Sequence, residues 1–262
     1  MVIGEWLLGA LSREPAAGAS AHGSVSYAPG TELALLRREY SGLSALVRGK
    51  RVVDFGCGTG EQSIALAREE GCEVLGIDSN PNTLQRAREK AASHALANAV
   101  SFAEAAPPEL AGKFDVVISQ NAMEHFPDPD HIVQVMKGLI HDQGLLLITF
   151  GPPWYAPYGS HMQYFCKVPW LNLLFSEHTV MRVRARYRSD CALRYVDVES
   201  GLNRMSLAKF ERVVADAGLE VRHWHLTCVK GVNVLAALPL LRELFVNHVS
   251  CVLARRQPRR QN

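Results

Sequence analysis

Three glycines follow a short apolar run and have the spacing of a ligand-binding turn. The segment reads VVDFGCGTG, with Gly56, Gly58 and Gly60 where a strand would turn into a helix. Glycine has no Cβ, so the backbone at such a turn comes close to a ligand. A tight turn made of small residues is the plainer interpretation, and dinucleotide-binding enzymes use a related pattern. The turn therefore indicates a nucleotide-type site only together with its surroundings.

The next apolar run ends in a carboxylate that suits the same ligand. Asp78 lies in VLGIDSNPN, directly after the run. A carboxylate at this place accepts hydrogen bonds from both hydroxyls of a ribose. Helix capping is the alternative role, but Pro81 suits the first helical position and makes Asn80 the natural N-cap. We therefore predict that Asp78 binds a ribose.

Two histidines are candidate general bases, because imidazole accepts a proton near neutral pH. His125 lies in MEHF, and His161 lies in the aromatic stretch PYGSHMQYF. His125 is equally suited to organising its loop by hydrogen bonding. His161 follows the last strand of an alternating region, on the side where open α/β folds bind ligands, and is preferred. Tyr155 and Tyr158 are predicted to contact the acceptor, with packing of a small subdomain as the alternative.

Alternating strands and helices would position these residues. Several strands, such as VVISQ and LLLITF, are continuous apolar runs, which is typical of a parallel sheet covered on both faces. The order predicts a doubly wound α/β fold. Strands are expected at 51–55, 73–77, 100–103, 114–119, 144–150, 221–229 and 248–255, and helices at 31–47, 62–69, 81–95, 131–140 and 207–217.

The length favours one large domain with an elaboration. With 262 residues, the chain can bury one substantial core. Residues 1–30 are predicted to be a mobile N-terminal segment, and residues 31–262 to form a single domain. Residues 151–205 break the alternation and are too long for a simple connection, so we expect them to form a lid over an acceptor site.

Composition narrows the partners and the compartment. Lys and Arg number 28 against 26 Asp and Glu, so no broad footprint for nucleic acid is expected. The six cysteines include no CxxC pair, which favours reduced thiols in the cytoplasm. No His, Cys or carboxylate cluster has metal-ligand spacing. The stretch VPWLNLLF, followed by MRVRARYR, is either a core element or an interfacial helix in weak contact with a membrane surface.

Four motifs in register resemble the class I S-adenosylmethionine-dependent methyltransferases of the small-molecule type. They are VVDFGCGTG, VLGIDSN, FDVVISQNAMEHFPDP and GLLLITF, and the resemblance covers residues 48–152 well and the final strand pair loosely. It implies a mostly parallel, seven-stranded Rossmann-like sheet and S-adenosylmethionine as cofactor. By this resemblance the cofactor lies against Asp54, Gly56, Gly58, Gly60, Asp78, Ser79, Ser119, Gln120 and Asn121.

One position departs from the family. An Asp that often follows the third strand and accepts from the adenine amino group is absent, and VSFAEAAPPEL offers Glu104 instead. Either Glu104 or a backbone group is expected to make this contact.

The expected reaction is transfer of a methyl group to a small or medium-sized metabolite, with oxygen preferred over nitrogen or carbon as the acceptor atom. Two alternatives stay open at this point. A nicotinamide-dependent oxidoreductase would usually show G-x-G-x-x-G in place of G-C-G-T-G. A non-catalytic protein that binds S-adenosylmethionine would keep the fold without the acceptor chemistry.

Overall fold

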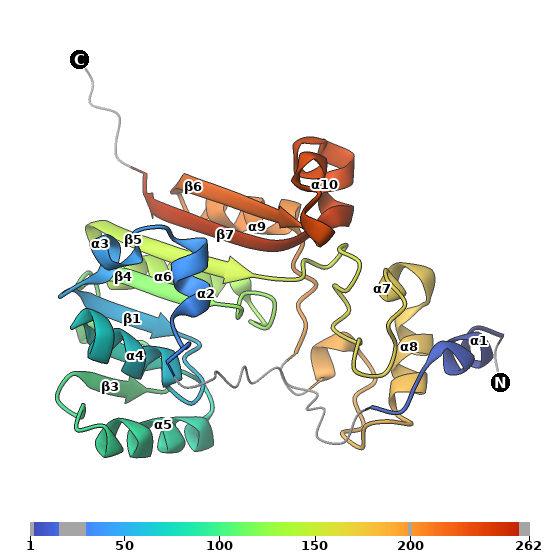
Figure 1. Cartoon of the computed structure of the whole chain (residues 1–262), viewed down its shortest axis with the longest axis horizontal. Coiled ribbons are helices and arrows are strands. Elements are labelled where there is room, and N and C mark those ends of the chain that lie inside the picture. Colours follow the sequence, from blue (N-terminus) through green and yellow to red (C-terminus); the bar gives the residue numbers. More distant parts are fainter. Residues whose placement is uncertain (1–2, 16–29, 199–200, 257–262) are drawn as a thin grey trace.

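A single seven-stranded sheet organises the chain (Figure 1). The computed structural model describes residues 3–15, 30–198 and 201–256. The strand order is β3-β2-β1-β4-β5-β7-β6, in which the first five strands are parallel and β7 is antiparallel to both of its neighbours. The predicted doubly wound, mostly parallel sheet is confirmed. The strands are β1 (Arg51–Phe55), β2 (Glu73–Ile77), β3 (Val100–Ala103), β4 (Phe114–Gln120), β5 (Ile140–Phe150), β6 (Leu219–Cys228) and β7 (Val246–Arg255).

Helices cover both faces of this sheet, as its apolar strands require. One core lies under α2 (Ala34–Glu39), α3 (Leu43–Val47), α4 (Glu61–Glu70) and α5 (Pro81–Ser93). A second core lies under α6 (Pro129–Leu139) and α9 (Leu207–Asp216) on the opposite face. The single helix predicted over 31–47 is divided, because Gly42 adopts a left-handed φ of 83° between α2 and α3.

Capping side chains fix where the helices near the strand ends begin. The Asn80 side chain accepts from the amides of Asn82 and Thr83, as predicted, with Pro81 in the first turn of α5. Asp128 accepts from the His131 amide at 3.0 Å, so α6 begins at Pro129, slightly before the predicted start. Both caps lie in loops that follow strands of the parallel part of the sheet.

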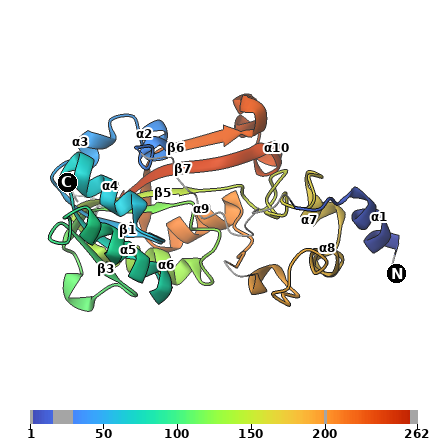
Figure 2. The same cartoon turned by 60° about the horizontal axis from the view of Figure 1, so that its bottom comes forward.

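A third core lies beyond the carboxyl ends of the parallel strands (Figures 1 and 2). It is built by the elaboration that follows β5, including α7 (Leu171–Leu174) and α8 (Glu177–Arg184), with Leu8 of α1 (Ile3–Leu11) buried among them. The structure thus differs from the prediction of a mobile segment over residues 1–30: residues 3–11 form a helix because they gain apolar contacts from α8. Residues 16–29 of that segment lie outside the described residues.

Candidate functional site

The Gly-rich turn connects β1 to α4 with three left-handed glycines. Gly56, Gly58 and Gly60 have φ values of 81°, 53° and 79°, which L side chains rarely adopt. A Cβ at Gly60 would lie 2.9 Å from Ala87 Cβ, whereas a Cβ at Gly58 would meet nothing within 4 Å. Gly60 therefore serves packing, and Gly58 exposes its backbone to open space.

Asp78 joins this turn to the end of β2. Its Oδ2 accepts from the Gly58 amide at 2.9 Å, and its Oδ1 accepts from the Asn80 amide at 2.9 Å. The side chain is partly exposed, and a carboxylate offers about four lone-pair positions, so each oxygen keeps capacity for another donor. Asp78 thus positions the turn and still offers acceptor capacity.

Asp54 lies beneath the turn. Its carboxylate accepts from Gln62 Nε2 at 2.7 Å and from Ser63 Oγ at 2.6 Å, both on the first turn of α4. Burial raises its pKa to about 6, although these hydrogen bonds oppose the rise. The residue is 2 % exposed, so in this structure it supports the turn from below.

The end of β4 supplies the next group of predicted cofactor residues. Ser119 is fully buried in the sheet, while Gln120 and Asn121 are partly exposed. Asn121 has a left-handed φ of 50°, a conformation that costs free energy for a residue with a Cβ and that is enriched at functional sites. Its backbone amide donates to the carbonyl oxygen of Thr149 in β5 at 2.9 Å, and this hydrogen bond fixes the end of β4 against β5.

Two further predicted residues lie at the same edge. Ser79 is exposed next to Asp78. Glu104 is exposed and follows β3 directly, and the Asp78 amide donates to the carbonyl of Ala103 at 3.2 Å. Glu104 therefore lies close to the end of β2, and its contact with an adenine stays a prediction.

The two candidate bases lie against each other. The rings of His125 and His161 are 5.7 Å apart between centroids and meet edge to face at 85°. His125 Nδ1 lies 2.8 Å from the carbonyl oxygen of Gly201, and His161 Nε2 lies 3.4 Å from that of Pro152. Burial, helped by His125, lowers the pKa of His161 to about 4, so this imidazole is neutral at pH 7.

The loop that holds His125 is pinned from two sides. Glu124 is buried, and its Oε1 accepts from the Gly151 amide at 3.1 Å at the end of β5. The Asn203 side chain donates to the carbonyl oxygens of Met123 and Phe126 at 2.7 and 2.8 Å. Residues from both ends of the elaboration thus fix the loop after β4.

The aromatic stretch divides between packing and exposure. Trp154 packs on Tyr195 with ring centroids 4.9 Å apart, and Phe165 stacks on Tyr187 at 5.2 Å. These rings serve the third core. Tyr155 is exposed and Tyr158 is partly exposed, and the Tyr158 carbonyl accepts from the His161 amide at 2.9 Å. Tyr158 is therefore joined directly to the candidate base.

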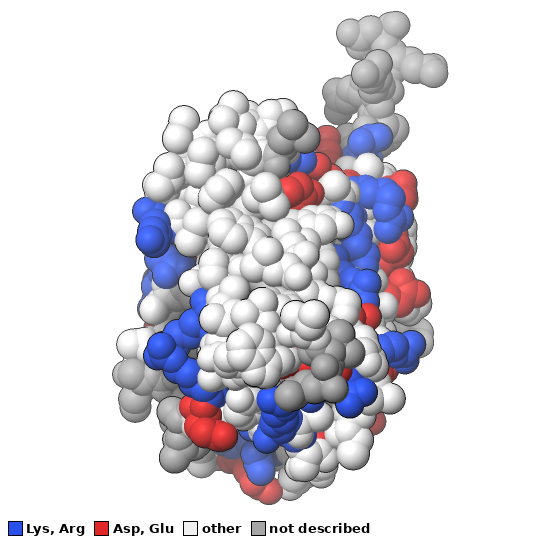
Figure 3. Space-filling view, turned by 90° about the vertical axis from the view of Figure 1, so that its right-hand side faces the viewer, with Lys and Arg blue, Asp and Glu red and all other residues white. Residues whose placement is uncertain are grey.

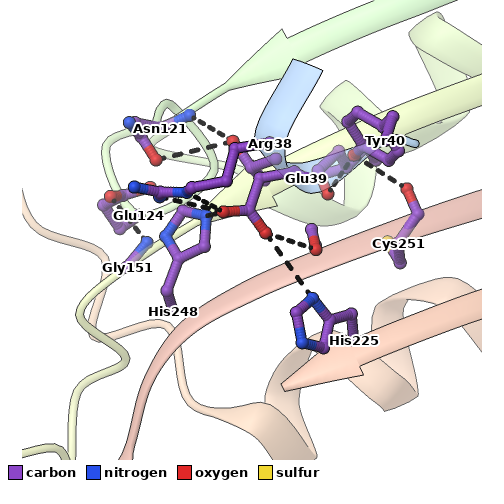
Figure 4. A network of polar contacts seen from close by, with 12 residues as sticks. Arg38, Glu39, Tyr40, Asn121, Glu124, Gly151, His225, His248 and Cys251 are labelled. Atoms are coloured by element: carbon purple, nitrogen blue, oxygen red, sulfur yellow. Dashed lines mark hydrogen bonds and ion pairs between the residues drawn. The ribbon is translucent and has the colours of Figure 1, made fainter. Parts of the chain in front are cut away.

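Sequence reasoning missed a polar cluster around Glu39 of α2 (Figure 4). The carboxylate accepts from Arg38 Nε and Ser250 Oγ, both at 2.9 Å, and lies 3.7 Å from His225 Nδ1 and 3.8 Å from His248 Nε2. Burial raises the pKa of Glu39, but the hydrogen bonds from Arg38 and Ser250 outweigh it and leave the pKa below its ordinary value. The carboxylate is therefore ionised at neutral pH.

The register of the sheet shows why the cluster lies near the candidate site. Ser250 pairs with Thr149, and Thr149 pairs with Gln120 at the end of β4. Side chains alternate along a strand, so these polar residues continue the apolar rows of Leu147 and Ile118 on the same face. That face changes from apolar to polar at the carboxyl edge. The alternation was visible in the sequence, but the partner on α2 was not.

A cavity of about 470 Å³ lies elsewhere, between α9 and β6, with Trp224 and Arg242 in its wall. Because β6 is the edge strand farthest from β2, this cavity is not part of the site at the Gly-rich turn. Among the residues described, no group of three or more His, Cys, Asp or Glu side chains is arranged to hold a metal ion.

A Rossmann-like sheet with a Gly-rich turn after β1 and a carboxylate after β2 defines a nucleotide-binding α/β protein. Residues 46–152 match the family described as "Methyltransferase domain". These residues, less than half of the chain, are thus similar to methyltransferase domains, as the resemblance of the four sequence motifs indicates. This match does not favour the nicotinamide-dependent alternative.

Named methyltransferases are also similar to this chain. A ubiquinone biosynthesis O-methyltransferase of Neisseria meningitidis is 36 % identical over 121 residues, which cover 44 % of this chain and 49 % of that protein. The chloroplastic tocopherol O-methyltransferase of Arabidopsis thaliana is 38 % identical over 38 % of this chain and 30 % of its own length. The match thus spans about half or less of these relatives. A methyltransferase structure from Mesorhizobium loti has the same fold, with a TM-score of 0.56 and 16 % identity over 87 % of this chain and 99 % of that one.

Proposed function

We propose that this protein transfers the methyl group of S-adenosylmethionine to an oxygen atom of a small or medium-sized metabolite. The observation that carries the proposal is the joining of the Gly58 backbone and the Asp78 carboxylate at the edge of a methyltransferase domain, with two adjacent histidines in the loops after β4 and β5. The named O-methyltransferase relatives support oxygen as the acceptor atom.

The residues present fit this cofactor. The space over Gly58 is open, Asp78 has acceptor capacity for ribose hydroxyls, and Asn121 is held in a left-handed conformation at the end of β4. Asp54 and Ser119 take supporting places beneath them, while Ser79 and Glu104 lie exposed at the rim. When bound, S-adenosylmethionine supplies a methyl group on a sulfonium, an electrophile that needs no metal.

The chain then has to orient the acceptor and remove its proton. Well-oriented groups supply roughly 7 to 11 kcal/mol of a barrier, so most of the rate comes from positioning. A hydroxyl acceptor also needs a base, and His161 is neutral and hence able to take a proton at pH 7. We assign proton removal to His161, orientation of its ring to His125, and contact with the acceptor to Tyr155 and Tyr158.

Gly58→Ala tests the cofactor site, with Gly71→Ala as its matched control. Both glycines are left-handed, and a Cβ at either would meet nothing within 4 Å, but they flank opposite ends of α4. Each substitution should lower the free energy of unfolding by roughly 1 to 2 kcal/mol, because both place a side chain on a left-handed backbone. Only Gly58→Ala should also weaken S-adenosylmethionine binding, since its methyl group enters the space assigned to the ligand.

Isothermal titration calorimetry with S-adenosylmethionine, S-adenosylhomocysteine and NAD measures this difference. We expect the first two to bind and NAD not to bind. Equal cofactor affinities for the Gly58 and Gly71 variants would reject the placement of the ligand. A second experiment screens oxygen acceptors with methyl-labelled S-adenosylmethionine. Cofactor binding without methyl transfer to any of them would leave the non-catalytic alternative.

We also propose that the protein works in the cytoplasm. All six cysteines lie in the described residues and are free, and five of them are buried. This pattern supports a reducing compartment. A small-molecule acceptor, with no nucleic acid, fits the near-neutral charge.

A further inference from the structure

The surface over the third core carries exposed apolar side chains. Helix α1 buries Glu5 and Leu8 and packs on α8, yet its other side is also apolar and exposed. Ile3 is 83 % exposed and Trp6 is 61 % exposed, and Leu7 and Leu11 lie on the same side of the helix. A helix that is apolar on its solvent side marks an interaction surface.

Exposed apolar residues of two other segments extend this surface. Leu174 of α7 is 64 % exposed, and Val234 of the 3-10 turn η4 (Asn233–Ala237) is 71 % exposed. Two contacts join these segments to α1. Helix α7 packs on α8, which also packs on α1. Trp170, just before α7, packs on Phe245 of α10 (Pro239–Phe245) with ring centroids 5.7 Å apart, and α10 packs on η4. We call this surface the apolar face; it comprises Ile3, Trp6, Leu7, Leu11, Leu173, Leu174, Val234 and Leu238.

Basic side chains flank the apolar face (Figure 3). Four basic side chains near α1 are exposed, namely Arg13, Lys167, Arg182 and Arg186. Arg186 lies against Gly9 of α1, and Arg182 forms a 3.2 Å ion pair with the buried Glu5. An apolar centre with Lys and Arg beside it complements an anionic lipid surface, where acyl chains take up the apolar groups and phosphates meet the cations.

We propose that the apolar face docks on the surface of an anionic lipid bilayer. The tryptophan on α1 suits the boundary between headgroups and acyl chains. The contact is peripheral, since none of the helices within the described ranges is long and apolar enough to cross a membrane. A second copy of the chain is the competing occupant, but a self-interface would not need the basic flank.

Docking would bring the candidate acceptor site to the bilayer. Met162 next to His161 is buried in the same core as Leu8 of α1. If the proposed function holds, an acceptor with a lipid tail reaches the histidines from the membrane side. The docking itself does not depend on methyl transfer and is measured without it.

Vesicle flotation tests the proposal with the full chain. The parent protein should float with vesicles that contain phosphatidylglycerol, less with vesicles of phosphatidylcholine alone, and less again as salt rises. The double substitution Trp6→Glu and Leu7→Glu should weaken binding by at least about tenfold, or about 1.4 kcal/mol. Lys167→Glu with Arg186→Glu should remove the preference for phosphatidylglycerol.

Val221→Glu is the matched control, because Val221 is exposed to a similar degree as Leu7, 47 % against 44 %, on β6 away from this face. It should float like the parent. All variants should keep S-adenosylmethionine affinity, which separates loss of docking from loss of fold.

Failure of the parent to float with phosphatidylglycerol vesicles, or unchanged flotation of the Trp6 and Leu7 variant, overturns the proposal. A dimer in light scattering that this variant dissociates assigns the face to a second copy instead.

Discussion

Asp78→Ala is expected to weaken S-adenosylmethionine binding by about 10- to 150-fold, which corresponds to the roughly 1.5 to 3 kcal/mol of a hydrogen bond to a charged group. The substitution removes the acceptor assigned to the ribose hydroxyls. It also frees the amides of Gly58 and Asn80, so the turn itself loosens. Asp78→Asn keeps one acceptor oxygen and should fall between the parent and the alanine variant.

Asp115→Ala is the control for the loss of a carboxylate that holds backbone. Asp115 Oδ2 accepts from the Arg51 amide at 2.9 Å, the same distance as in the Asp78 contact, but at the amino end of β1. Calorimetry should give parent-like cofactor affinity for this variant. If Asp115→Ala and Asp78→Ala weaken binding equally, Asp78 acts through stability alone and the ribose assignment fails.

The alternating part of the fold could be predicted because its information is local. The apolar runs at Arg51–Phe55 and Glu73–Ile77 have the observed bounds, and Asn80 caps its helix as expected. Such features depend on residues a few positions apart. The same local reasoning brought Gly58 and Asp78 to one edge, since carboxyl ends of parallel strands share an edge.

Features that depend on distant residues could not be predicted in this way. Helix α1 gains its packing from α8, which begins at Glu177, so the residues near α1 did not predict a packed helix within residues 1–30. Glu39 meets Ser250 across 211 positions, and no pattern near either residue points to the other. Asp54 sits in the predicted motif, but its burial under α4 depends on how Gln62 and Ser63 turn back toward it.

Replacing the imidazole of His161 is expected to lower turnover about 100- to 10,000-fold with a hydroxyl acceptor, the range typical of a general base. His161→Asn is the sharpest variant, because the residue has a left-handed φ of 55° and asparagine tolerates that conformation. Cofactor affinity should stay within about threefold, or about 0.7 kcal/mol. His141→Asn is the control and should leave turnover unchanged, because His141 lies at the amino end of β5, away from the carboxyl ends of the strands.

The pH profile distinguishes a base from a structural residue. Burial lowers the pKa of His161 to about 4, and a base works only in its unprotonated form. Activity should therefore hold as pH falls through 6.5 (roughly the ordinary histidine value) and decline only toward pH 4. His125→Asn removes a neighbour that also lowers this pKa, so the acid limb should move to higher pH. A limb near pH 6.5 in the parent, or a His161→Asn enzyme at the parent rate, would move proton removal to another group, with His125 the first to examine and His248 beside Glu39 the next.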